Sequence, residues 1–187
     1  MPAFFLALVA VALTSFGGRD QLLMADLSAR QGGRLGLLVV GCIIAVITAA
    51  AMALSGQYIA SILPSAGKTM LVAFALFAAA FELAWPVKVK PPKEPTYSLG
   101  ATAIVMLARQ LGDGSRFLIF AFAASTGTPW FAAAGGALGG MIAIAAGWTM
   151  AEDLPVILPL KLIRRVLAAI ILIVGIYVGL SARGIVG

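Results

Sequence analysis

Six long apolar segments dominate the chain. They cover about residues 3–25, 36–56, 67–85, 99–123, 130–150 and 165–182. A helix that spans a bilayer needs roughly 20 mostly apolar residues, and backbone groups in lipid must be hydrogen-bonded within the segment. No basic residue precedes the first segment, since the first is Arg19, so we interpret it as a retained span rather than a signal peptide. The pattern predicts an all-α integral membrane protein with six transmembrane helices.

Composition agrees with a bilayer as the solvent. Hydrophobic residues make up 62% of the chain and charged residues 11%, whereas a soluble domain is about half apolar and a quarter charged. The chain has no histidine and one cysteine, which excludes a Cys/His metal cluster, an internal disulfide and a hydrolytic triad that needs histidine. We therefore expect no enzyme activity, no bound cofactor and no nucleic-acid partner.

The basic residues lie mostly at the ends of the apolar segments and predict a topology. Loops after the first, third and fifth segments hold Arg30, Arg34, Lys88, Lys90, Lys93, Lys161, Arg164 and Arg165. The opposite side holds only Lys68 and Arg183. The positive-inside rule places the first group in the cytoplasm. We therefore expect a bacterial inner-membrane protein with both termini outside.

The proline- and lysine-rich stretch at residues 86–98 divides the chain into two halves, 1–85 and 99–187. A shift of 95 residues aligns Gly17 with Gly112 and Gly32 with Gly127, and superimposes "ILP" at 62–64 on "ILP" at 157–159. Each half contains three segments, and an odd number makes the second copy enter the membrane from the opposite face. The sequence therefore predicts two inverted three-helix repeats joined by a cytoplasmic linker, an architecture that is common in transporters.

Two polar clusters interrupt the first segment of each half at related positions. They read "SFGGRDQ" at 15–21 and "QLGDGSR" at 110–116. An intramembrane charge costs on the order of 2.5–3.5 kcal/mol even on the lenient insertion scale. The clusters contain the glycines Gly17, Gly18, Gly112 and Gly114, which allow helix unwinding, and they contain or adjoin Arg19, Arg109 and Arg116. Two such clusters predict a functional site where the repeats meet.

These features resemble the Golgi calcium/manganese–proton antiporter family, which includes bacterial manganese exporters. Members have two halves of three helices, each with a Glu-x-Gly-Asp-Lys/Arg-Ser/Thr motif on its first helix. The resemblance covers almost the whole chain, through the segment count, the repeat, the central basic linker and the motif positions. It implies that acidic residues of both motifs form one cation site, exposed alternately to the two sides.

The motif positions carry over one by one. In the first half, Ser15 stands at the Glu position, Gly17 matches, Gly18 stands at the Asp position, Arg19 matches the basic residue and Asp20 replaces the hydroxyl. In the second half, Gln110 replaces Glu, Gly112 and Asp113 match, Gly114 replaces the basic residue and Ser115 matches. Of the four expected carboxylates, only Asp113 is in place.

The candidate transport site therefore consists of Asp113, Gln110, Ser15 and Asp20. Mn²⁺ and Ca²⁺ prefer oxygen ligands, and carboxylates offset the charge of the ion. Ser15 and Gln110 offer neutral oxygens, and Asp20 adds a charge if unwinding turns it inward, so the site is expected to be weaker for divalent ions. Alternatively, Asp113 neutralises arginines at helical spacing, Arg109 and Arg116, as part of a structural ion network.

The sequence is compatible with three hypotheses about function. The first is a secondary transporter that exports Mn²⁺ or Ca²⁺ in exchange for protons by alternating access. The second is a diverged membrane scaffold that keeps the fold without transport. The third is a transporter of a different solute, for example an anionic one, because Arg19, Arg109 and Arg116 outnumber the motif acids. A homo-oligomer is compatible with each reading.

Other motifs have simpler interpretations. "LGDG" is similar to the Gly-x-Gly-Asp motif of intramembrane aspartyl proteases, but Gln110 occupies the first position. Glu82 is interpreted as an interfacial residue, with a proton relay as the alternative. Asp26 is interpreted as solvated or paired with Arg30, and Glu152 with Asp153 as a turn cap. The glycine pairs 135/139 and 136/140 have the small-xxx-small spacing of tightly crossing helices.

Overall fold

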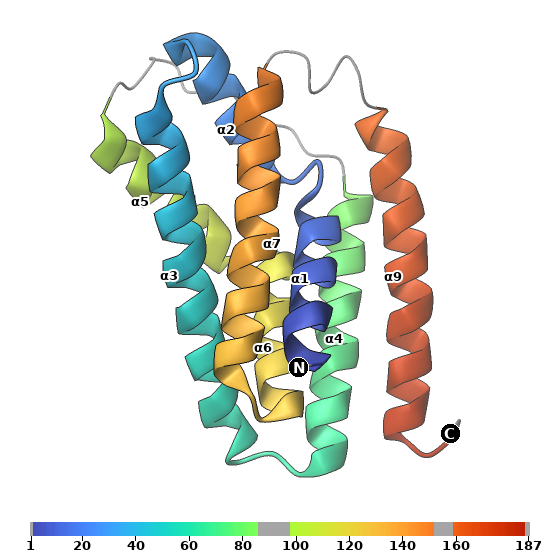
Figure 1. Ribbon diagram of the computed structural model, residues 1–187. Coiled ribbons are helices and arrows are strands. Elements are labelled where there is room, and N and C mark those ends of the chain that lie inside the picture. Colours follow the sequence, from blue (N-terminus) through green and yellow to red (C-terminus); the bar gives the residue numbers. More distant parts are fainter. Residues whose placement is uncertain (1, 86–97, 152–158, 186–187) are drawn as a thin grey trace.

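The computed structural model describes residues 2–85, 98–151 and 159–185, and these parts are helical apart from short turns. Figure 1 labels the eight helices within these ranges. They are α1 (Pro2–Ser15), α2 (Arg19–Gln31), α3 (Leu35–Ala60), α4 (Ser65–Ala84), α5 (Leu99–Leu111), α6 (Gly114–Thr126), α7 (Pro129–Met150) and α9 (Leu160–Ala182). The predicted all-α class is confirmed. The linker expected at 86–98, apart from Ser98, and the cap expected from Glu152 and Asp153 lie outside the described residues.

Four of the described helices, α3, α4, α7 and α9, are long and apolar enough to cross a membrane. α1 and α2 pass the same test only as a pair that bends by 60°. α5 has 13 residues, which at 1.5 Å per residue covers about 20 Å of a hydrocarbon core about 30 Å thick. The described residues thus hold four span candidates, or five with the bent pair, and the predicted six are not confirmed. The difference arises because glycines and charges divide the first and fourth apolar segments into shorter helices.

The two helix breaks have local causes. α1 ends before Gly17, whose φ of +66° is a left-handed conformation that favours glycine. α5 ends at Gly112, and α6 begins after Asp113, whose carboxylate accepts a hydrogen bond from the backbone N–H of Ser115. This is N-capping, which satisfies a donor that the first helical turn leaves unpaired. Both breaks fall inside the polar clusters that the sequence singles out.

Helix boundaries recur at the predicted spacing. The first residues of α2 and α6, Arg19 and Gly114, are 95 residues apart, as are Ser65 and Leu160, which begin α4 and α9. Gly32 and Gly127, the residues that cap the C-termini of α2 and α6, both have φ of +65°. The other two pairs of helix starts are 97 residues apart (Pro2 and Leu99) and 94 residues apart (Leu35 and Pro129), so the two halves have the same order of helices and a similar spacing.

α7 packs at the centre of the bundle against α1, α2, α3 and α6 (Figure 1). A Cβ atom on Gly139 would lie 2.7 Å from the carbonyl oxygen of Leu8 and 2.9 Å from the backbone nitrogen of Ala12. Gly135 lies equally tightly against the backbone of Phe4. These glycines let α1 and α7 approach closely, which confirms the packing role predicted from their spacing.

Apolar side chains cover much of the outer surface. α9 packs along α4 at the edge of the bundle, and its exposed side chains include Val166, Ile170 and Ile173. α3 exposes Val39, Ile43 and Ile47 in the same way. Soluble monomers rarely expose such large apolar surfaces, so the helices indicate a multi-pass membrane protein in contact with lipid.

The connections are sorted between two ends of the bundle (Figure 1). The α2–α3 turn, the C-terminus of α4 and the N-terminus of α9 lie toward one end, and the α3–α4 and α6–α7 turns toward the other. Both chain ends lie toward the second end. This sorting agrees with the predicted grouping of the loops, while the compartment that each end faces stays a prediction.

Candidate functional site

The two polar clusters lie close together. Asp20, in the first turn of α2, lies beside Gln110 of α5 and is near enough to Asp113 and Arg116 to interact electrostatically. The cluster of one half thus meets the cluster of the other where both helices are broken. This proximity is what a site shared by the two halves requires.

Asp113 is held at the start of α6. Its Oδ1 accepts the backbone N–H of Ser115 at 3.3 Å, and its Oδ2 accepts the Ser115 hydroxyl at 2.7 Å. The side chain is partly buried and lines a cavity. A carboxylate at the N-terminus of a helix also interacts favourably with the helix dipole. Asp113 is therefore fixed in orientation while part of it remains accessible.

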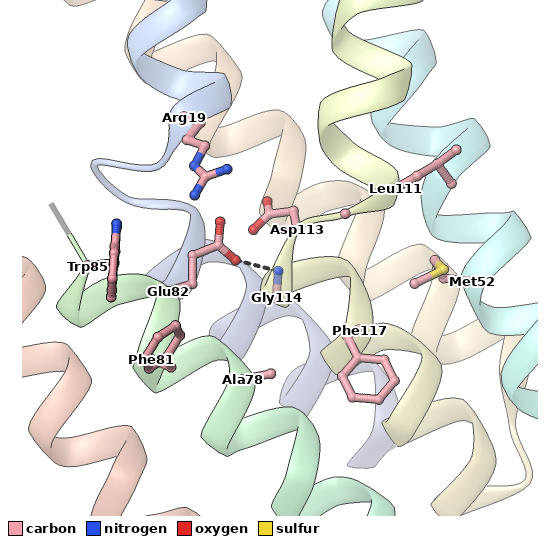
Figure 2. Close-up of a pocket in the computed structure, with 11 residues that line it drawn as sticks. Arg19, Met52, Ala78, Phe81, Glu82, Trp85, Leu111, Asp113, Gly114 and Phe117 are labelled. Atoms are coloured by element: carbon pink, nitrogen blue, oxygen red, sulfur yellow. Dashed lines mark hydrogen bonds between the residues drawn. The ribbon is translucent and has the colours of Figure 1, made fainter. Parts of the chain in front are cut away.

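Glu82 lies beside Asp113, although the sequence suggested an interfacial position. It comes from the last turn of α4, and its Oε2 accepts the backbone N–H of Gly114 at 2.6 Å. Figure 2 shows the two carboxylates next to each other, with Arg19 above them. Gly114 permits the approach, since a Cβ there would lie 2.9 Å from Glu82 Oε2 and 3.0 Å from the Cα of Ala79. One feature of the sequence could have pointed to Glu82 as a site residue: it is the sole acidic residue of an apolar helix.

An open cavity of about 510 Å³ contains these charges (Figure 2). Arg19, Glu82 and Asp113 form its charged wall. Most of the remaining lining is apolar or aromatic and comes from Met52, Phe81, Trp85, Leu111 and Phe117. Its size is that of a small-molecule site.

A second cavity, of about 10 Å³, shares the two carboxylates with the first one. Glu82 and Asp113 line it as well, together with Thr14, Gly18, Ser115 and Arg164. Its volume is close to that of one water-sized probe. The carboxylates therefore border both the open cavity and a small space beside the first helix break.

Gln110 and Arg116 belong to a buried polar layer next to the cavity. Gln110 Oε1 accepts the Thr48 hydroxyl of α3 at 2.7 Å and Arg116 Nη2 at 3.0 Å. Gln110 is 0% exposed and Arg116 2% exposed. The guanidinium fits because it packs on Gly140 of α7, where a Cβ would lie 2.7 Å from it. Ion binding through Gln110 Oε1 would require it to release one of these donors.

The layer is not fully paired. Arg116 Nε, Arg116 Nη1 and Gln110 Nε2 have no hydrogen-bond partner among the described residues. Asp20 and Asp113 are the acidic groups that interact electrostatically with Arg116. Asp113 and Asp20 therefore both contribute to balancing the charge of Arg116, and neither forms a salt bridge with it among the described residues.

The remaining predicted residues are partly buried or exposed. Ser15, the last residue of α1, and Asp20 are partly buried, and neither lines the 510 Å³ cavity. Arg109 is partly buried in the last turn of α5, and Arg19 is exposed at the cavity wall. The expected pair of Asp26 with Arg30 is formed at 3.0 Å. Of the four candidate ligands, Asp113 alone lines the cavity.

Both backbone groups of Gly17 are held by side chains that the sequence did not single out. The Gly17 N–H donates to Gln21 Oε1 at 2.6 Å, and its carbonyl accepts from Arg164 Nη1 at 2.6 Å. Arg164 Nη2 also donates to the carbonyls of Glu82, at 2.7 Å, and Trp85, at 3.4 Å. Arg164 was counted among the topology-determining loop charges, but it is buried in the first turns of α9 and joins three parts of the chain.

A tight metal cage is not formed by the described residues, which contain no group of three or more His, Cys, Asp or Glu side chains that could hold a metal ion. Comparisons with protein-family models, curated proteins and solved structures find no match to this chain. Function must therefore be inferred from the residues and their geometry.

Proposed function

We propose that this chain is a secondary transporter that exchanges a cation for protons across a membrane. The observation that carries the proposal is the pair of carboxylates, Glu82 and Asp113, in an open cavity where two broken helices meet a third helix. Ionisable groups inside a membrane protein commonly mark a substrate path or a proton relay. Two adjacent carboxylates can bind either a cation or protons. Antiport requires that the cation and the protons compete for the same site in this way.

The charge of the cavity favours a cation over the anionic solute considered as an alternative. Two carboxylates face one guanidinium, Arg19, across the wall. The N-terminus of α6 would attract an anion, but Glu82 accepts from Gly114 there and Asp113 caps the same turn. Arg116 lies in the buried layer and is not among the lining residues.

The spacing of the helix boundaries supports inverted repeats and alternating access as part of the proposal. In this view each repeat consists of a broken helix followed by two long ones, so the proposed six spans include α1 with α2 and α5 with α6. Glu82 and Asp113 line both the open cavity and the small space beside Gly17–Gly18. A rocking motion that closes the first and widens the second would transfer a bound cation between the two sides.

The resemblance to calcium/manganese–proton antiporters names Mn²⁺ and Ca²⁺ as the first cations to test. The proposal includes export from the cytoplasm across a bacterial inner membrane, with both termini outside. Since one motif carboxylate is in place and Glu82 is the second acid at the cavity, we expect low affinity for divalent ions. The competing hypothesis is a membrane scaffold that does not transport a solute.

Growth of a manganese-sensitive bacterial strain tests the divalent form of the proposal. Expression of the wild-type chain should restore growth in manganese, and Asp113→Asn should abolish the rescue. Asp26→Asn is the matched control, because Asp26 pairs with Arg30 away from the cavity. Rescue by Asp113→Asn would disprove its role. Absence of rescue by a wild-type chain that inserts in the membrane would exclude the divalent form of the proposal and favour either the scaffold or a transporter of a different solute.

A further inference from the structure

The cavity combines a charged wall with an aromatic one. Phe81 lies in the last turn of α4 and Trp85 directly follows the helix, with ring centroids 5.4 Å apart, and Glu82 lies between them in the chain. Phe117 of α6 adds a third ring. Figure 2 shows the Phe81 and Trp85 rings on one side of the Glu82 side chain and Asp113 on the other.

The dimensions suit an organic solute better than a bare metal ion. Ca²⁺ takes six to eight oxygen ligands at about 2.3–2.6 Å, and Mg²⁺ needs a tighter octahedron. The described residues bring two carboxylates to a space of about 510 Å³ and contain no acidic, Cys or His cluster of three. Pockets of 300–1,000 Å³ are typical for small organic ligands.

The charge balance points to a single positive charge. Glu82 and Asp113 are acidic and Arg19 is basic, so the residues that line this cavity carry a formal excess of one negative charge. Arg116 and Arg164 interact electrostatically with these acids from outside the lining. A monovalent cation neutralises this excess. Substituted ammonium and guanidinium groups are also attracted to the faces of Trp and Phe rings within about 6 Å of the centroid.

Two of the aromatic side chains that line the cavity are little covered by the rest of the described chain. Phe81 is 67% exposed and Trp85 57% exposed, so the rest of the described chain leaves them largely uncovered. Both belong to the lining of the cavity that holds the carboxylates. A cation held at Glu82 and Asp113 can therefore place apolar substituents against these rings.

We propose that the cavity binds a small monovalent organic cation, a substituted ammonium or guanidinium. Its charged group lies at Asp113 and Glu82, and its apolar substituents lie against Phe81, Trp85 and Phe117. This inference rests on the proposed function and narrows it by naming the class of solute. A metal ion is the competing occupant, and the experiment below separates the two.

Isothermal titration calorimetry on the purified full-length chain in detergent tests the inference, with tetraethylammonium chloride and manganese chloride as probes. Tetraethylammonium should bind saturably, and Asp113→Asn combined with Glu82→Gln should remove the binding. Phe81→Ala with Trp85→Ala should weaken it about tenfold, since two contacts of roughly 0.7 kcal/mol each correspond to that factor. Trp130→Ala is the matched control, because Trp130 is 67% exposed on α7 and does not line the cavity.

The remaining outcomes have distinct meanings. Manganese binding that depends on Asp113, without tetraethylammonium binding, would overturn the inference and leave the proposed function standing. Tetraethylammonium binding that survives loss of both carboxylates or both rings would also overturn the inference. If neither probe binds to the folded wild-type chain, the inference and the proposed cation site both fail. Phe81 and Trp85 are surface residues, so the variants are expected to keep the buried core.

Discussion

Two carboxylates, Glu82 and Asp113, lie 31 positions apart in the chain and share one cavity wall. Asp113 stands in a polar cluster within an apolar segment, and its spacing from Gly112 and Ser115 matches a known motif. Glu82 has no such context, since no local pattern indicates that the end of α4 contacts the start of α6. The contact depends on Gly114, whose missing side chain lets Glu82 reach a backbone N–H. Likewise, the sequence suggested Gln110 as an ion ligand, but its oxygen accepts from Thr48 and Arg116, which only the fold brings together.

At the residue scale, Glu82→Gln should remove the negative charge of this side chain and keep its hydrogen bond to the Gly114 N–H. The amide oxygen can still accept the Gly114 N–H, so the fold and the thermal unfolding midpoint in detergent should change little. Loss of one of two cavity carboxylates should reduce cation transport in vesicles about tenfold, the effect of roughly 1.4 kcal/mol. Transport at the wild-type rate in Glu82→Gln would contradict a role for this carboxylate.

At the element scale, broken helices determine the site, and the breaks were readable from the sequence. Adjacent glycines at 17 and 18, and Gly112 followed by an Asp–Gly–Ser sequence, favour helix termination and a new N-terminus. The contacts that stabilise the breaks were harder to predict from the sequence. Arg164 looked like a loop charge because basic residues near span ends usually mark the cytoplasmic side. In the fold it instead donates to backbone carbonyls of Gly17, Glu82 and Trp85.

Arg164→Met should therefore destabilise the junction of α1, α2, α4 and α9. Its hydrogen bonds are charge-assisted, and the Gly17 carbonyl would lose its partner, so the free energy of unfolding should fall by about 3 kcal/mol. Chemical denaturation in detergent micelles measures the change. Arg165→Met is the control, because this neighbour is exposed on the same turn of α9. Equal stability of the two variants would show that the Arg164 contacts do not hold the junction.

At the scale of the whole molecule, composition alone indicated a membrane protein, and the exposed apolar faces of α3 and α9 agree with it. The number of spans was harder to predict, because the hydropathy of the first apolar segment does not reveal the 60° bend between α1 and α2. The hydropathy pattern likewise joined α5 and α6 in one segment at 99–123, although Arg109, Asp113 and Arg116 lie around the break between the two helices. The spacing of 95 residues between related helix starts was visible in the sequence and recurs in the fold.

Single-cysteine labelling tests the predicted orientation. Cys42 is the sole cysteine, so Cys42→Ala gives a background into which Ser61→Cys or Arg165→Cys is introduced. Ser61 lies in the α3–α4 turn and Arg165 near the start of α9, and both are exposed. In intact spheroplasts a membrane-impermeant maleimide should label position 61, and it should label position 165 only after lysis. The reverse pattern would invert the topology, and labelling of both positions before lysis would contradict the spanning arrangement.

The most direct test of cation–proton exchange uses purified protein in proteoliposomes that contain a pH-sensitive dye. Inward gradients of manganese, calcium and tetraethylammonium, each as the chloride salt, are applied in turn to wild-type and Asp113→Asn vesicles. We predict that at least one of the three cations drives protons out of wild-type vesicles, and that Asp113→Asn vesicles respond like protein-free ones. Equal proton movement in the variant, or no proton movement with any of the three cations in the wild type, would contradict the account.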